Sequence, residues 1–293
     1  IKQIPGVADV VLEQQYEPAA SENTVQPNME ISTGMTGTTT AWSTGYTGAG
    51  MRIAIIDTGL DTSHQSFDNG AYEYALEQNA ARAKESVEAY KASLDLLDAD
   101  EINEKLSLLH IKEGVSAADL YRTEKVAYGY CYIDKDLDVT HETDTEGEHG
   151  SHVAGIAAAN RYLPDGNGGY VSALDSVHMH GAAPDAQVLV MKVFGDEGGA
   201  YDSDYTAAIE DAIVLGADTI NLSLGSASPG PSKARTEAYQ KIFDDLENAS
   251  SVVTVSSGNA GYWAKNADPI GYLYSDGVSM QTDGQPGSYA NSL

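Results

Sequence analysis

The sequence has few basic residues, and this shortage limits the partners that the chain can have. Among its 293 residues, 16 Lys and Arg stand against 44 Asp and Glu, which gives a formal net charge of −28. Nucleic acids and anionic membranes would repel such a chain, so we expect neither as a partner. No apolar run is long enough to span a membrane, and the amino terminus shows no signal-peptide pattern.

Cysteine is almost absent as well. The single Cys131 excludes a disulfide within the chain. It lies in the apolar run 126–133, which favours a buried, unreactive thiol. An apolar content of 42% at this length is typical of a large globular domain with a full core.

From residue 51 onward, short apolar runs alternate with segments of helical pattern. We expect strands at 51–57, 126–133, 187–193, 218–222 and 251–256, and helices at 149–160, 203–215 and 233–248. This alternation predicts an α/β fold, a three-layer parallel sheet with helices on both faces. Functional side chains in such sheets gather at the carboxyl ends of the strands.

Two segments interrupt this pattern. Residues 1–18 contain a plausible strand, and residues 19–50 are a linker or surface wrap with one helical turn near 39–44. Residues 71–122 are rich in helix formers and predict a helical insertion, including a capping box from Ser116 to Asp119. A charged, solvated helix face is the simpler interpretation of this insertion, and a wall of a substrate site is the alternative.

Polar side chains follow three of the apolar segments. Asp57 ends the strand at 51–57, His149 stands in EHGSHVAG (148–155), and Asn259 in SSGNAG (256–261). A histidine suits a general base, a buried carboxylate can orient it, and an Asn amide can stabilise an oxyanion. In this order the three residues indicate acyl-transfer chemistry.

The motifs around these residues resemble the subtilisin family of serine proteases. They are IAIIDTGLD (53–61), HGSHVAG (149–155), NLSLG (221–225) and SSGN (256–259). The long insertion before His149 and GQPGS (284–288) are most similar to the lactocepin-type cell-envelope proteinases. The resemblance implies a secreted or cell-surface serine endopeptidase in which Asp57 and His149 are the catalytic pair and Asn259 the oxyanion residue.

The same resemblance implies that 51–293 is the amino-terminal part of the catalytic domain and that 1–18 is the end of an inhibitory propeptide. It also implies that a peptide or protein substrate pairs with two backbone segments. One segment contains Ser223, Leu224 and Gly225, and the other contains Gly198 and Gly199.

The family's nucleophile is missing from the expected pattern. Ser279, in GVSMQ, follows Asn259 by only 20 residues, and the sequence after it cannot continue as a buried helix. We therefore expect an incomplete domain whose catalytic serine comes from a carboxyl-terminal remainder of the same protease. This chain alone is expected to be inactive.

Metal binding and specificity are less defined. No cofactor is certain, and calcium is possible, although Ser66 stands where the family's calcium aspartate is expected and Asp68 is displaced by two residues. An acidic cluster near 198–199 either favours basic substrate residues or is a solvated loop. Its members are Asp196, Glu197, Asp202 and Asp204.

Two other functions remain open. Histidines could bind a metal, but the spacing of His149 and His152 is not that of a zincin helix. The chain could also be a catalytically inactive, peptide-binding protease homologue. The candidate metal ligands are Glu148, His149, His152, His178 and His180, whereas His64, His110 and His141 are expected at the surface or in packing.

Overall fold

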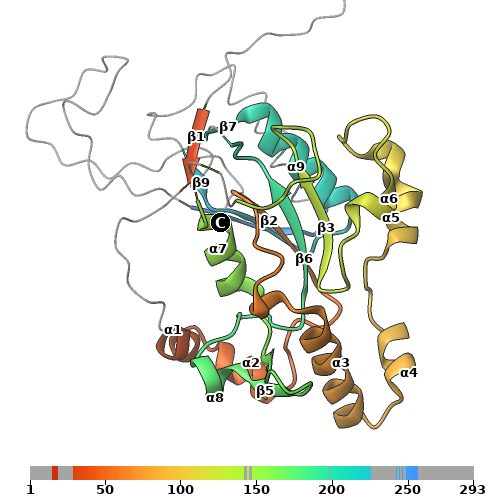
Figure 1. Ribbon diagram of the computed structural model, residues 1–293, viewed down its shortest axis with the longest axis vertical. Helices are drawn as coiled ribbons and strands as arrows, with labels where there is room; N and C mark the ends of the chain where they lie inside the picture. The colour runs from red at the N-terminus through yellow and green to blue at the C-terminus, as the bar shows by residue number, and fades with distance from the viewer. Residues whose placement is uncertain are drawn as a thin grey trace, which may run out of the picture.

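A parallel sheet forms the centre of the computed structural model, which describes residues 15–18, 29–141, 144, 147–196, 198–225, 242, 244, 246 and 249–256 (Figure 1). Its strand order is β10-β8-β2-β6-β3, with every pairing parallel. The strands are β2 (Arg52–Asp57), β3 (Val126–Cys131), β6 (Gln187–Lys192), β8 (Thr219–Leu222) and β10 (Val252–Val255). All five predicted strands are confirmed.

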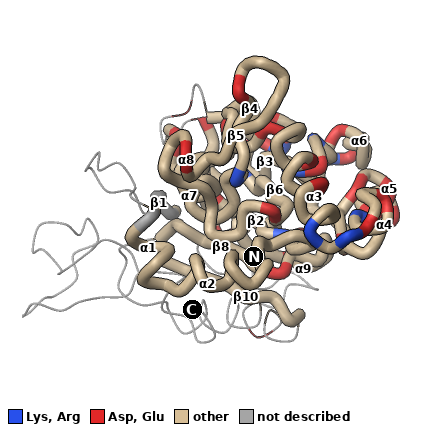
Figure 2. The backbone as a smooth tube through the Cα atoms, turned by 90° about the horizontal axis from the view of Figure 1, so that it is seen from below, with Lys and Arg blue, Asp and Glu red and all other residues tan. Residues whose placement is uncertain are grey.

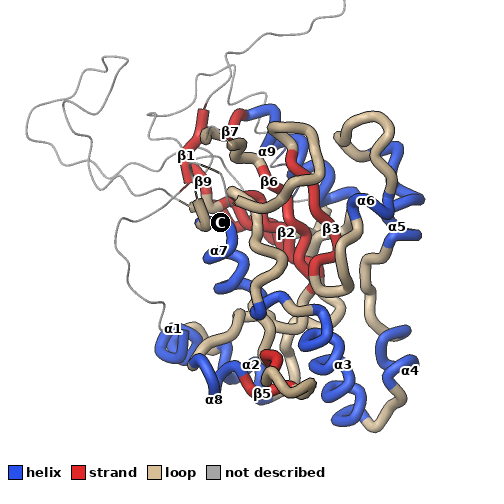
Figure 3. The backbone as a smooth tube through the Cα atoms, in the orientation of Figure 1, coloured by secondary structure: helices blue, strands red, loops and turns tan. Residues whose placement is uncertain are grey.

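Helices cover both faces of this sheet (Figure 3). Alternate residues of β2 point to opposite faces, as the period of a strand requires. Ile53 and Ile55 pack with Ala154 of α7 (His149–Ala158) in one core cluster. Ala54 and Ile56 belong to a second cluster, which includes the buried residues of α9 (Asp202–Val214). The predicted three-layer α/β fold is therefore confirmed.

The segment 71–122 is helical, as predicted, and shares the core on the α9 face. Its helices are α3 (Asn69–Ala83), α4 (Val87–Ala92), α5 (Ala99–Lys105), η2 (Leu106–Leu108) and α6 (Ala117–Leu120). Leu97, Ile102 and Leu109 are buried in the cluster that also contains Ile56. These apolar side chains therefore pack in the core. Asp119 accepts hydrogen bonds from the backbone and side chain of Ser116, which confirms the capping box.

A buried arginine ties this segment to the amino end of β2. Arg52 is 2% exposed, and its guanidinium contacts both carboxylate oxygens of Glu101 at 2.8 Å. It also donates to Asp95 at 2.8 Å and to the carbonyl of Leu215 at 2.7 Å. A planar fork of donors suits this arrangement, because two parallel bonds fix its orientation.

The remaining elements lie outside the main sheet. Within the predicted linker, the turn near 39–44 appears as α2 (Thr38–Ser43), and α1 (Met29–Met35) was not predicted. The others are β1 (Gln15–Pro18), η1 (Gln65–Phe67), β4 (Tyr162–Pro164), β5 (Tyr170–Ser172), α8 (Ala173–Val177), β7 (Ala200–Tyr201) and β9 (Leu224–Gly225). The helix expected at 233–248 falls almost entirely outside the described residues.

Acidic residues lie on several helices, among them α3 to α6, α8 and α9, and on loops, with few Lys and Arg between them (Figure 2). No helix in the described ranges is long and apolar enough to cross a membrane. Cys131 is buried as expected, and burial raises the pKa of its thiol to about 12. This thiol is therefore a packing group rather than a nucleophile.

Candidate active site

Asp57 and His149 meet at the carboxyl end of the sheet. Asp57 is the last residue of β2 and is 1% exposed, whereas His149 begins α7 and is 13% exposed. His149 Nδ1 lies 2.7 Å from Asp57 Oδ1, and the backbone N–H of Thr58 donates to the same oxygen at 2.7 Å. A carboxylate can only accept, so Nδ1 carries the proton and Nε2 is left as the basic nitrogen.

Thr58 connects the strand end to the segment that carries His149. Its hydroxyl donates to the carbonyl of Gly147 at 3.0 Å and accepts from the N–H of Gly150 at 2.8 Å. Thr58 is fully buried, and its bond to Gly150 is shielded from water, while its bond to Gly147 is partly buried. Sequence reasoning did not identify this residue, although its place directly after Asp57 was a signal.

The first turn of α7 approaches β2 so closely that residue 150 must be glycine. A Cβ at Gly150 would lie 2.3 Å from the carbonyl oxygen of Gly59 and 3.2 Å from the Cβ of Asp57. Gly59 itself has φ of +112°, which other residues rarely adopt. The two glycines therefore allow the contact between Asp57 and His149.

A short three-stranded sheet lies beside this pair. β1 is its central strand and pairs antiparallel with β7 and with β9. Opposite β9, Glu17 pairs with Gly225 and Pro18 with Leu224. Because β9 follows β8 after the single residue Ser223, this sheet begins at the carboxyl edge where Asp57 lies.

The predicted substrate-binding residues border β1. Leu224 and Gly225 form β9, while Gly198 and Gly199 directly precede β7. Gly198 has φ of +82° and Gly199 has φ of +78°. A Cβ at Gly199 would lie 2.1 Å from the side-chain nitrogen of Gln15, so glycine allows β1 to approach.

The segment that leads to Asn259 starts next to this three-stranded sheet. The N–H of Ser256 donates to the carbonyl of Leu222 at 3.0 Å, and its hydroxyl donates to the carbonyl of Leu224 at 3.0 Å. Sequence reasoning did not give Ser256 this role. Asn259 and Ser279 lie outside the described residues.

The acidic cluster expected near the groove does not act as a unit. Asp202 is fully buried at the start of α9, where its carboxylate accepts from the hydroxyl of Tyr205 at 3.3 Å. It is neither solvated nor exposed to a substrate, so both interpretations are wrong for this residue. Asp196 is 70% exposed. Glu197 lies outside the described ranges, and Asp204 belongs to the first turn of α9.

The described residues assemble no metal site from three or more His, Cys, Asp or Glu side chains. His149 is engaged by Asp57, and buried His180 packs on Trp42 with a ring distance of 4.2 Å. Asp68, considered for calcium, instead accepts from the N–H of Ala71 at 2.7 Å and caps α3.

The other histidines contact neighbouring elements. His110 Nδ1 lies 2.8 Å from Asp211 Oδ1, which joins the segment 71–122 to α9. His141 Nε2 lies 2.6 Å from the hydroxyl of Ser151, and His64 caps η1 by accepting from the N–H of Ser66. These are packing and capping roles, as expected.

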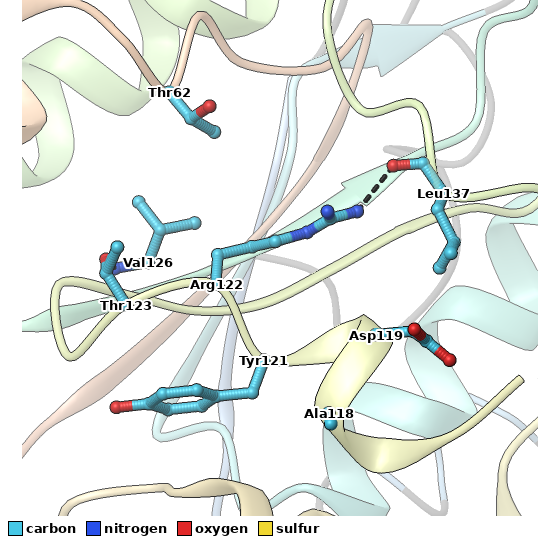
Figure 4. A pocket seen from close by; sticks show the side chains of 8 residues that line it. All are labelled: Thr62, Ala118, Asp119, Tyr121, Arg122, Thr123, Val126 and Leu137. Atoms are coloured by element: carbon cyan, nitrogen blue, oxygen red, sulfur yellow. Dashed lines mark hydrogen bonds between the residues drawn. The ribbon is translucent and has the colours of Figure 1, made fainter.

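A pocket of about 490 Å³ lies away from the catalytic pair, between α6 and β3. Arg122 extends across it and donates to the carbonyl of Leu137 at 2.5 Å (Figure 4). None of the predicted catalytic or substrate-binding residues lines it. The lining residues are Thr62, Ala118, Asp119, Tyr121, Arg122, Thr123, Val126 and Leu137.

Comparison with known proteins agrees with the motifs. Residues 48–293 match the subtilase family. A PII-type proteinase of Lacticaseibacillus paracasei is 28% identical over 267 residues, which cover 89% of this chain and 11% of the relative. A PI-type proteinase of Lactococcus lactis subsp. cremoris is 27% identical over 294 residues, covering 98% of this chain and 13% of the relative.

Another relative is the minor extracellular protease Vpr of Bacillus subtilis strain 168. It is 29% identical over 246 residues, which cover 82% of this chain and 22% of the relative. The expected resemblance to cell-envelope proteinases is confirmed. The chain spans only 11–13% of the length of the PI-, PII- and PIII-type relatives that it matches.

Proposed function

The chain belongs to the subtilase family, and from that membership we propose that it supplies the Asp, the His and the oxyanion Asn of a serine endopeptidase. The observation that carries this proposal is the contact of 2.7 Å between His149 Nδ1 and Asp57 Oδ1 at the carboxyl end of the parallel sheet. The substrate is a protein or peptide, bound as an extended strand.

In the proposed mechanism, each residue has one role. A serine in the remainder of the protease, carboxyl-terminal to residue 293, attacks the substrate carbonyl. His149 takes the serine proton on Nε2 and later delivers it to the leaving amine, while Asp57 holds the ring and stabilises the imidazolium. Asn259 donates its amide to the oxyanion, an effect worth roughly 100- to 1000-fold in turnover where it has been measured in subtilisin.

Substrate binding is proposed to follow the pairing of β1. Strand addition to backbone on both sides depends on main-chain hydrogen bonds rather than on side-chain identity. Leu224 and Gly225 would supply one side, with Ser223 at its start, and the segment from Gly198 and Gly199 into β7 the other. The natural substrates would then be chosen mainly by side-chain pockets along this groove.

The position of β1 supports the proposal that residues 1–18 are the end of an inhibitory propeptide. β1 runs antiparallel to β9, so its carboxyl end at Pro18 points back toward Ser223 and the edge that carries Asp57. A peptide bond a short distance after Pro18 would therefore reach His149. Amino-terminal sequencing of the mature protease tests this: a mature start within residues 19–35 supports self-cleavage here, and retention of residue 1 contradicts it.

The activity is tested by labelling the complete gene product with a fluorophosphonate, followed by a denaturing gel and mass mapping. We expect one labelled serine beyond residue 293 and no labelling in a His149→Ala variant. Labelling of Ser279 would show that the nucleophile has been assigned wrongly. Peptide binding without any labelling would favour the alternative, an inactive peptide-binding homologue.

Export to the cell envelope or the medium is proposed from the relatives, which include a protein named as an extracellular protease. Fractionation of the native host tests it. The chain should be found outside the cell membrane, and recovery in the cytoplasm alone would contradict it.

A further inference from the structure

A second charged residue stands beside Asp57 at the carboxyl edge of the sheet. Lys192, the last residue of β6, pairs directly with Asp57 of β2 in the parallel register. Residues paired in this way point to the same face. Ile53 and Ile55 of β2 and Val188 and Val190 of β6 pack in the core cluster on the α7 face. By alternation, Asp57 and Lys192 point to that face too.

The ammonium of Lys192 is buried, and it binds the loop that leads to His149. The side chain is 1% exposed, and Nζ lies 2.6 Å from Asp144 Oδ2 and 2.7 Å from the carbonyl oxygen of Thr140. The Asp144 side chain is 3% exposed. Both partners belong to the connection between β3 and α7, so a single cation holds this connection at two points, four residues apart.

Other contacts hold the same connection against β2. The N–H of Leu60 donates to the carbonyl of Val139 at 2.7 Å, and Thr58 binds the carbonyl of Gly147. The Lys192 contacts fall between these two attachments. Together these contacts attach Val139, Thr140, Asp144 and Gly147, described residues of this connection, to β2 and β6 within ten residues before His149.

The charged forms of Lys192 and Asp144 depend on the contact between the two side chains. Burial raises the pKa of the Asp144 carboxyl, and contact with Lys192 opposes this effect. Burial would lower the pKa of Lys192, but contact with Asp144 outweighs it and the pKa is raised. The two groups therefore hold each other in the charged form, and removing one would leave the other buried without compensation.

We propose that Lys192 is a positioning residue for catalysis: through Asp144 and Thr140 it fixes the loop that places His149 against Asp57. This rests on the proposed peptidase function. Lys192 does not touch the substrate, so its loss should reduce kcat much more than it changes KM. A displacement of about 1 Å in such a site can cost roughly 100-fold in rate, and we expect a loss of 10- to 100-fold.

The charges around His149 determine the expected pH dependence. Asp57 faces it from β2, Glu148 and His152 lie on or beside its own helix, and His141, Asp144, Lys192 and Asp196 come from the surrounding loops and from β6. Asp144→Asn removes one negative charge and leaves Lys192 in place. The imidazolium form of His149 then becomes less favourable, so the acid limb of kcat/KM should move to lower pH.

A double variant separates charge from geometry. Asp144→Asn combined with Lys192→Met removes one charge of each sign and leaves the net charge of the site unchanged. Its acid limb should return toward that of the wild type, while kcat stays low because the loop has lost its anchor. Lys192→Arg keeps the charge and two or more donors, and should recover part of kcat.

Lys125→Met is the matched control. Lys125 is also fully buried, and its Nζ donates to the carbonyls of Pro184 and Ala186 at 2.9 and 2.8 Å. It precedes β3, at the amino edge of the same sheet and therefore away from Asp57. Loss of this buried lysine should alter stability while leaving kcat and the acid limb unchanged.

The experiment measures kcat, KM and the pH profile of the complete gene product on a chromogenic peptide, with thermal unfolding as the check of folding. Three results support the proposal: the double variant has a low kcat, the acid limb of Asp144→Asn lies at lower pH, and Lys125→Met keeps the wild-type kcat and acid limb. If the double variant does not fold, the pH profile of Asp144→Asn and the kcat of Lys192→Arg test the proposal instead. Wild-type kcat and pH profile in folded variants overturn it, whereas an inactive wild type would overturn the proposed function instead.

Discussion

At the scale of single residues, Thr58 holds the segment that carries His149 next to Asp57. Thr58 directly follows Asp57, and its hydroxyl bonds to the backbone on both sides of His149, at Gly147 and at Gly150. Thr58→Val removes the hydroxyl and leaves the buried N–H of Gly150 without this acceptor, which costs about 1–3 kcal/mol. We expect at least a 10-fold fall in kcat/KM.

Thr58→Ser is the matched control for this prediction, because it keeps the hydroxyl and loses only a methyl group. It should retain most of the wild-type kcat/KM, measured on the same peptide substrate. Equal activity of the Val and wild-type proteins would show that the bridge does not position His149.

Lys125 should make the stability of the fold depend on pH. Burial lowers the pKa of this lysine from 10.5 to about 7. Between these values the unfolded chain binds more protons than the folded one, so this contribution to the free energy of unfolding rises with pH. Below about pH 7 the penalty for burying the charge is fully present.

Lys125→Met removes this penalty while keeping a similar side-chain volume. Its free energy of unfolding should exceed that of the wild type most at pH 6. The advantage should shrink by roughly 2–3 kcal/mol at pH 9. Urea unfolding at the two pH values measures it, and a difference that does not change with pH would contradict the lowered pKa.

At the scale of elements, the docking of the segment 71–122 depends on the contact between Arg52 and Glu101. Burial raises the pKa of Glu101, but the bonds from Arg52 and Lys105 outweigh it and the pKa is lowered. A lowered acid pKa stabilises the fold above the ordinary value of 4.5, and the gain is lost as pH falls through the folded value. Glu101→Gln should cost about 2 kcal/mol at pH 7.

Glu104→Gln, an exposed position on the same helix, is the control and should be close to neutral. Hydrogen exchange should show faster exchange over α5 and η2 in Glu101→Gln but not in Glu104→Gln. The difference in stability between Glu101→Gln and the wild type should disappear at strongly acidic pH. If the difference in stability remained at strongly acidic pH, its cause would be packing rather than charge.

The sequence predicted the central elements because their signals are local. The run 53–56 is apolar throughout, as is typical of a strand buried on both faces. The motif around His149 likewise predicted that a helix begins at this histidine. Both depend on residues that are adjacent in the chain.

The rest of the site depended on long-range contacts that no local pattern reveals. Lys192 and Asp144 become partners only once β6 lies next to β2, and the burial of Asp202 requires the packing of α9 on the sheet. A charged residue that ends a buried strand was a usable signal at Lys192. At Asp202, an acidic surrounding sequence suggested exposure, and tertiary packing overrode it.

At the scale of the whole molecule, the imbalance of charge should oppose folding. A net charge of −28 on 293 residues produces repulsion that is greater in the compact state than in the unfolded one. Salt screens this repulsion over a Debye length of about 10 Å at 0.1 M, whereas buried pairs such as Lys192 with Asp144 are screened much less. The melting temperature of the chain should therefore rise by several degrees between about 10 mM and 0.3 M NaCl.

Two controls make this prediction specific to charge. Sorbitol at equal osmolarity should give a smaller rise, because it does not screen. Calcium chloride at equal ionic strength should match NaCl if screening alone acts, and a clearly larger rise would reveal a specific cation site that the described residues do not form. A melting temperature that falls with NaCl would mean that surface ion pairs outweigh the net repulsion, and that the excess of acids is arranged to attract the few bases rather than spread at random.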